Sequence, residues 1–114
     1  MILDEKITNE LFLLCEKAGQ PEMIHTLVLQ FVELAKEWQD SALEQSPEEL
    51  ARSLHTLRGR SGSMGATYLM GCVEQAEIAV SAATIRPEGL QSLHQAIDLT
   101  IEAWIDLLKS RTAT

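Results

Sequence analysis

Residues 46–66 read SPEELARSLHTLRGRSGSMGA and carry the signals that begin and end one helix. Ser46 suits the N-cap, Pro47 suits the first helical position, and Glu49 completes a reciprocal capping box with Ser46. The apolar spacing then defines an inward face made of Leu50, Leu54, Leu57 and Ser61. The glycines from Gly62 to Gly65 predict the end of the helix. The stretch therefore predicts one amphipathic helix.

Similar patterns lie on both sides of this stretch. We expect a helix near residues 8–18, with an apolar stripe formed by Ile7, Leu11, Leu14 and Ala18. A longer helix carries Ile24, Leu27, Val28, Phe31, Ala35, Trp38 and Ala42 on one side. The next carries Leu69, Cys72, Val73, Ala76, Val80 and Ala83 before a break at Arg86-Pro87, and the last carries Leu90, Leu93, Ile97, Ile101, Trp104 and Leu108.

The short connections between these helices favour antiparallel neighbours. The predicted fold is all-α, an antiparallel up-down four-helix bundle with a short extra N-terminal helical segment. At 114 residues the chain fits the size of a single domain, so we expect one domain over residues 1–114.

The composition limits the classes of partner. Nine basic and seventeen acidic side chains give a formal net charge of -8, which disfavours nucleic acid and anionic membrane surfaces. No apolar run approaches the length of a membrane span, and the start, MILDEKITNE, lacks the features of a signal peptide. We expect a cytoplasmic, monomeric protein with no membrane insertion of this chain.

The cysteines and two of the histidines give no sign of a cofactor. Cys15 and Cys72 fall on apolar helix faces and are expected to be reduced core residues. His25 and His94 lie on separate helices without metal-ligand spacing, so we expect no metal and no other cofactor. The sequence also lacks a nucleotide-binding loop or a kinase motif set.

His55 is the remaining histidine, and it falls about 120° from the centre of the apolar stripe of its helix. It should face solvent, together with Glu48, Arg52, Gly59 and Gly62. A glycine inside a helix costs about 1 kcal/mol relative to alanine. Gly62 also fits a helix end, but Gly59 is followed by further helical residues. A bare backbone beside His55 would let another protein's surface come close.

The segment from Leu54 to Ala66 resembles the signature of histidine-containing phosphotransfer domains. That signature reads His, any residue, Leu, Lys or Arg, Gly, and then small residues leading to Gly-Ala. The helix lengths on either side also resemble the four-helix bundle of that family over nearly the whole chain. Arg60 departs from the pattern, because the family usually has a small residue there, but position 60 turns away from His55 on the helical wheel.

The resemblance implies that His55 takes a phosphoryl group from an aspartyl phosphate on the receiver domain of a hybrid sensor kinase. His55 would then pass the group to the receiver of a response regulator, and the chain would have no kinase activity of its own. A neutral imidazole has the nitrogen lone pair that this chemistry needs, and Arg58 offers a permanent cation to the phosphoryl oxygens. The required Mg²⁺ would belong to the acidic pocket of the receiver.

The same resemblance assigns one further position, and the residues themselves indicate three more. A polar residue twenty-two positions after the histidine contacts the imidazole in the family, and here that position is Glu77. A carboxylate there would fix the tautomer of the ring, although Glu77 also fits an ordinary surface residue. Gly59 and Gly62 would allow docking, and Arg52 would complement an acidic partner pocket or simply be solvated.

Two other functions stay open. The bundle could dock a receiver or kinase domain without being phosphorylated, as an inhibitor or scaffold, although the intact Arg58 and Gly59 beside His55 argue against this. It could also be a plain helical interaction domain with an incidental histidine. The sequence is compatible with a free-standing relay protein and with the terminal domain of a hybrid kinase.

Overall fold

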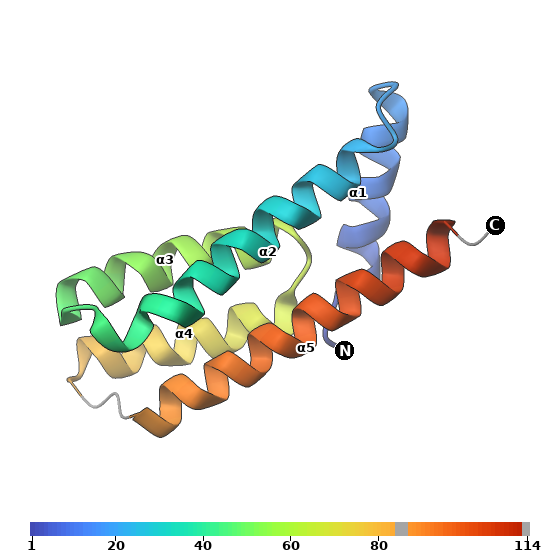
Figure 1. The fold of residues 1–114 in the computed structure, drawn as a ribbon. Helices are drawn as coiled ribbons and strands as arrows, with labels where there is room; N and C mark the ends of the chain where they lie inside the picture. Colours follow the sequence, from blue (N-terminus) through green and yellow to red (C-terminus); the bar gives the residue numbers. More distant parts are fainter. Residues whose placement is uncertain (84–86, 113–114) are drawn as a thin grey trace.

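The chain is all-helical in its described part, which confirms that the fold is all-α. The computed structural model describes residues 1–83 and 87–112. Within these ranges the elements are α1 (Glu5–Lys17), α2 (Met23–Ser41), the short 3-10 helix η1 (Ala42–Glu44), α3 (Pro47–Ser63), α4 (Thr67–Ser81) and α5 (Pro87–Thr112). Figure 1 shows α2, α3, α4 and α5 lying alongside one another, with α1 at one end between α2 and α5.

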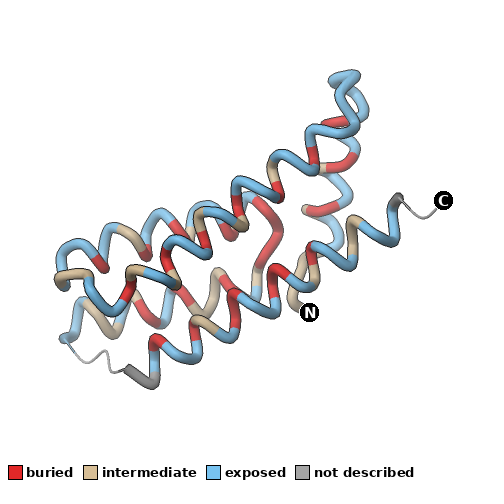
Figure 2. Tube along the Cα trace, in the orientation of Figure 1, coloured by how far each residue is buried: buried red, intermediate tan, exposed pale blue. Residues whose placement is uncertain are grey.

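The apolar faces of these helices meet along the axis of an elongated molecule of 47 × 22 × 22 Å. Figure 2 shows the buried positions recurring on one side of each helix. The predicted stripe, which covers α2 and ends at Ala42 in η1, is buried except Leu27, which is only partly buried. On α5 the predicted residues are buried except Leu108, which is half-buried. The core therefore follows the helical period of the sequence.

Helix α3 forms as its capping and spacing signals predict. The Glu49 backbone N–H donates to Ser46 Oγ at 3.2 Å, and the Ser46 N–H donates back to Glu49 Oε1 at 3.2 Å. The four buried residues of α3 are the predicted ones, Leu50, Leu54, Leu57 and Ser61. The Ser61 hydroxyl is satisfied by donating to the Leu57 carbonyl at 2.7 Å. This packing fixes the rotation of α3 and therefore the side on which its polar residues stand.

The turn between α3 and α4 has the geometry of a Schellman motif. The Ala66 N–H donates to the Ser61 carbonyl at 2.8 Å, and the Gly65 N–H donates to the Gly62 carbonyl at 3.1 Å. Gly65 has φ +70°, in the left-handed region where side chains are disfavoured. The turn reverses the chain, and α3, residues 64–66 and α4 together form what we call the α3–α4 hairpin.

Two contacts from outside the hairpin hold this turn in place. The indole N–H of Trp104, on α5, donates to the Met64 carbonyl at 3.1 Å. The backbone N–H of Asp4, just before α1, donates to the Gly65 carbonyl at 2.8 Å. A Cβ at position 65 would lie 3.2 Å from Ile7, so glycine also permits this close approach. The turn is thus anchored from both ends of the chain.

Two predictions about α1 were wrong. The helix begins at Glu5 rather than near residue 8, because the Asp4 carboxylate caps it by accepting from the Ile7 N–H at 3.2 Å. Its buried residues are Thr8, Phe12 and Cys15, whereas Leu14 is 64% exposed. The Phe12 ring packs 6.1 Å from the Trp104 ring, centroid to centroid. This aromatic contact sets the rotation of α1.

The predicted face of α4 is only partly buried. Leu69, Val73 and Ala76 are buried, while Cys72 and Val80 are half-buried against the core. Ala83 is exposed, because α4 ends at Ser81 and Ala83 adopts a left-handed φ of 54°. The predicted break begins at Arg86, which lies outside the described residues, and α5 begins at Pro87.

Candidate functional site

His55 stands on the outer surface of α3. Its side chain is 70% exposed, because the adjacent residue Leu54 and the later Leu57 occupy the buried face of the same helix. Helices α3 and α4 run alongside each other in Figure 1. The His55 side chain comes within 3.9 Å of Glu77, which belongs to α4. The imidazole is therefore open to another molecule.

Arg58 and Glu77 surround one nitrogen of this ring. Arg58 Nη2 lies 3.1 Å from His55 Nδ1, and Arg58 Nε lies 3.2 Å from Glu77 Oε1. Glu77 Oε2 lies 3.9 Å from His55 Nδ1. The three side chains form a charged triad in which α3 supplies the imidazole and the guanidinium and α4 supplies the carboxylate.

The distances within this triad separate a hydrogen bond from a longer electrostatic contact. A guanidinium has only donors, so the 3.1 Å contact is a hydrogen bond when Nδ1 presents its lone pair to Arg58. The 3.9 Å between Nδ1 and Glu77 exceeds hydrogen-bond length. In this structure Glu77 thus lies next to the imidazole but makes its shortest contact with Arg58.

Glu77 is also the most enclosed member of the triad. Its side chain is 23% exposed, against 38% for Arg58. Its Oε1 atom is buried and has no hydrogen-bond donor in suitable geometry among the described residues. Arg58 Nε is close enough for charge attraction to this oxygen, but it is not aligned for a hydrogen bond. A buried acceptor without a donor is unfavourable, so Glu77 retains an unused capacity to accept a proton donor.

The two glycines assigned to docking have different surroundings. A Cβ built on Gly59, one turn after His55, would meet nothing within 4 Å. A Cβ on Gly62 would lie 3.1 Å from Met70 Sδ, and Gly62 is only partly exposed. Gly62 therefore does not lie on a fully open outer face as the helical wheel indicated, because α4 packs close to that position.

The remaining cations of α3 do not take part in the triad. Arg52, one turn before His55, and Arg60 are both exposed. The Arg52 charge acts on Glu49, where it is the weakest of the causes that lower the pKa of that carboxyl. Arg52 therefore adds positive charge to the surface near His55 without touching the ring.

A shallow open hollow adjoins the triad on its α4 side. It is lined by Arg58, Glu74, Glu77, Ile78, Ser81 and Ala82. Sequence reasoning did not single out Ile78, which is 62% exposed. Its position outside the core stripe of its helix is the signal that could have indicated an exposed apolar residue.

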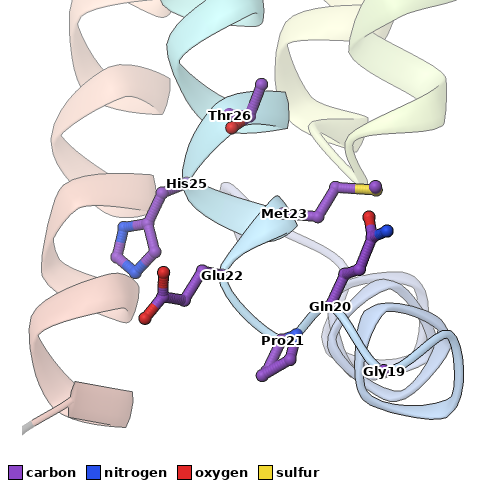
Figure 3. A pocket seen from close by; sticks show the side chains of 7 residues that line it. All are labelled: Gly19, Gln20, Pro21, Glu22, Met23, His25 and Thr26. Carbon is purple, nitrogen blue, oxygen red and sulfur yellow. The ribbon is translucent and has the colours of Figure 1, made fainter.

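A larger hollow, shown in Figure 3, lies at the α1–α2 connection between Gly19 and Thr26. None of its lining residues belongs to α3 or α4.

The described side chains offer no obvious metal centre. Within residues 1–83 and 87–112, no group of three or more His, Cys, Asp or Glu side chains is placed to hold an ion. Cys15 is buried and Cys72 half-buried, and both are free thiols. Among the helices described here, none is both long and apolar enough to cross a bilayer.

An exposed imidazole, a guanidinium and a carboxylate therefore lie together on the α3–α4 hairpin. Comparison with protein families shows that the model of the Hpt domain matches residues 20–110. The chain belongs to the Hpt domain family. Hpt domains act in histidine phosphotransfer in two-component phosphorelays, and they carry phosphoryl groups rather than acting as kinases. Comparisons with curated proteins and with solved structures gave no match.

Proposed function

We propose that His55 is the phosphoacceptor of this Hpt domain. It receives a phosphoryl group from an aspartyl phosphate on the receiver domain of a hybrid sensor kinase and passes it to the receiver of a response regulator. The observation that carries the proposal is the 70% exposed imidazole of His55, beside the open backbone of Gly59 and within the region matched by the family model.

The transfer is a nucleophilic displacement at phosphorus. A lone pair on the imidazole forms the N–P bond, while the bond between phosphorus and the donor's carboxylate oxygen breaks and its electrons stay with the carboxylate. Transfer to the next receiver is the reverse displacement by an aspartate carboxylate. The Arg58 guanidinium, 3.1 Å from the ring, is close enough to bind phosphoryl oxygens by charge-assisted hydrogen bonds.

The surface around His55 supports docking of an acidic receiver pocket. Arg52 and Arg58 add local positive charge to a chain of net charge -8, and Gly59 leaves the backbone uncovered. In this proposal Gly62 contributes by keeping α3 and α4 close rather than by direct exposure. Glu77 orients the imidazole from α4.

The architecture and assembly state belong to the same proposal. We assign residues 1–114 to one domain, in which α2 to α5 form an antiparallel up-down four-helix bundle and α1 is the extra N-terminal segment. The few residues between successive helices support this arrangement. We further propose that the domain acts as a cytoplasmic monomer.

The test is transfer from a phosphorylated receiver domain. Incubating the protein with a receiver carrying radiolabelled aspartyl phosphate should give an acid-labile label on the wild type and none on His55→Gln. His25→Gln is the matched control, because His25 is also exposed but lies on α2. Stable binding of the receiver without label on the wild type would instead support the docking function, and label persisting in His55→Gln would assign the phosphate to another residue.

A further inference from the structure

The Nδ1 atom of His55 has two neighbours with opposite requirements. Arg58, at 3.1 Å, can only donate, so its hydrogen bond needs the lone pair of Nδ1. Glu77, at 3.9 Å, can only accept when ionised, so a hydrogen bond to it needs a proton on Nδ1. A neutral imidazole carries its proton on one nitrogen and its lone pair on the other. Nδ1 can therefore satisfy only one of these neighbours at a time.

We infer that Arg58 is a positioning residue that holds the resting imidazole with its proton on Nε2, and that Nε2 becomes the nucleophile only after Arg58 leaves Nδ1 and the proton moves to Nδ1 beside Glu77. The inference rests on the proposed function of His55. Both recorded contacts of the ring use Nδ1, and the side chain is 70% exposed. Nε2 is thus the nitrogen available to a partner, and in the resting tautomer its lone pair is absent.

Glu77 can serve as the hydrogen-bond partner of Nδ1 in the tautomer that carries its proton there. Its carboxylate needs to approach Nδ1 by about 1 Å to reach ordinary hydrogen-bond length. Side-chain rotation is sufficient for such a change. The carboxylate oxygen nearest Nδ1 is Glu77 Oε2, and it would accept from a protonated Nδ1, while Oε1 faces Arg58 Nε at 3.2 Å. Glu77 can therefore replace Arg58 as the hydrogen-bond partner of Nδ1.

An arriving phosphoryl group supplies the reason for Arg58 to leave. A guanidinium binds phosphate oxygens more strongly than it binds a neutral nitrogen acceptor, because both partners are charged. The Nε2 proton passes to solvent and Nδ1 takes a proton from solvent, which leaves the ring neutral. Nε2 then forms the bond to phosphorus as the donor carboxylate leaves. The product ring carries Nδ1–H and a positive charge, which faces the Glu77 carboxylate.

Nitrogen NMR of the imidazole tests the inference on the whole isolated chain without any phosphate donor. Spectra are recorded at about pH 9, where imidazoles are generally neutral. The two neutral tautomers give distinct shifts for protonated and unprotonated nitrogens. The wild type should be almost wholly in the Nε2–H tautomer. In Arg58→Met the Nδ1–H fraction should rise at least threefold, and Arg58→Lys should restore part of the wild-type distribution, because an ammonium group also donates.

Two further variants control this measurement. Arg60→Met removes another exposed cation from the same helix and should leave the tautomers of His55 unchanged. Adding Glu77→Ala to Arg58→Met should lower the Nδ1–H fraction again, because the acceptor is gone. A wild type dominated by Nδ1–H, or an Arg58→Met spectrum matching the wild type, overturns the inference. Either result leaves the labelling of His55 intact, so it is distinct from failure of the proposed function.

Discussion

Replacing Gly59 with leucine should stabilise the fold and slow phosphoryl transfer. A Cβ at position 59 meets nothing within 4 Å, so a leucine side chain there starts in open space. Its higher helix propensity should add about 0.8 kcal/mol to the free energy of unfolding. For a chain of this length that gain corresponds to a rise in Tm of about 3 °C. A side chain in a helix leans toward the N-terminal turn, so the introduced leucine would cover the turn that carries His55.

The rate of phosphoryl transfer should fall because the introduced leucine covers the turn that carries His55. If a receiver must reach the space over Gly59, the added side chain should lower the rate of labelling from a phosphorylated receiver at least tenfold, or about 1.4 kcal/mol in the barrier. Thermal unfolding and a labelling time course on the same samples measure the two effects. Gly71→Leu is the matched control, because Gly71 has the same free space on α4, six residues before Glu77, and should show the stability gain alone. A Gly59→Leu protein labelled as fast as the wild type would refute the assignment of this surface.

Three changes test the fold, each measured by urea unfolding. Ser46→Ala should cost about 1 kcal/mol through loss of the cap. The Ser46 side chain, followed by its backbone N–H, lowers the pKa of Glu49 in the folded state. The stabilisation of the fold that results is fully present above the ordinary carboxyl pKa, and it is lost as pH falls through the lower pKa of the folded state. Ser46→Ala should therefore flatten the acid side of the stability profile. Trp104→Phe should cost about 1–3 kcal/mol, because the buried Met64 carbonyl loses its donor. Ala83→Gly should add about 0.5–1 kcal/mol by relieving the left-handed φ of 54°, and a loss would contradict that reading.

The helices could be predicted where capping and spacing signals agree. Helix α3 is the clearest case, because the Ser46 cap fixes its start and four residues at helical spacing define its buried face. Helix α1 could not be oriented in this way, because residues 11–15 are all apolar and the period is ambiguous there. Its rotation depends on the contact between Phe12 and Trp104, which are far apart in the sequence.

The proximity of His55, Arg58 and Glu77 could be expected from the sequence, but the contacts among them could not. The spacing of His55 and Arg58 makes them neighbours on one helix, and that signal could have indicated their hydrogen bond. Sequence reasoning assigned Arg58 to phosphoryl oxygens instead. It also could not show that Glu77 is closer to Arg58 than to the ring, since that order depends on side-chain rotamers.

The anchored turn at residues 64–66 holds the His55–Arg58–Glu77 triad within one structural unit. The imidazole, the guanidinium and the carboxylate all belong to one hairpin whose closed end is tied down by Trp104 and Asp4. Lineages that lengthen the α1–α2 connection or change the outer surface of α5 would leave that unit unaltered. Those segments can therefore change in sequence without altering the geometry of the three side chains, because the hairpin alone carries them.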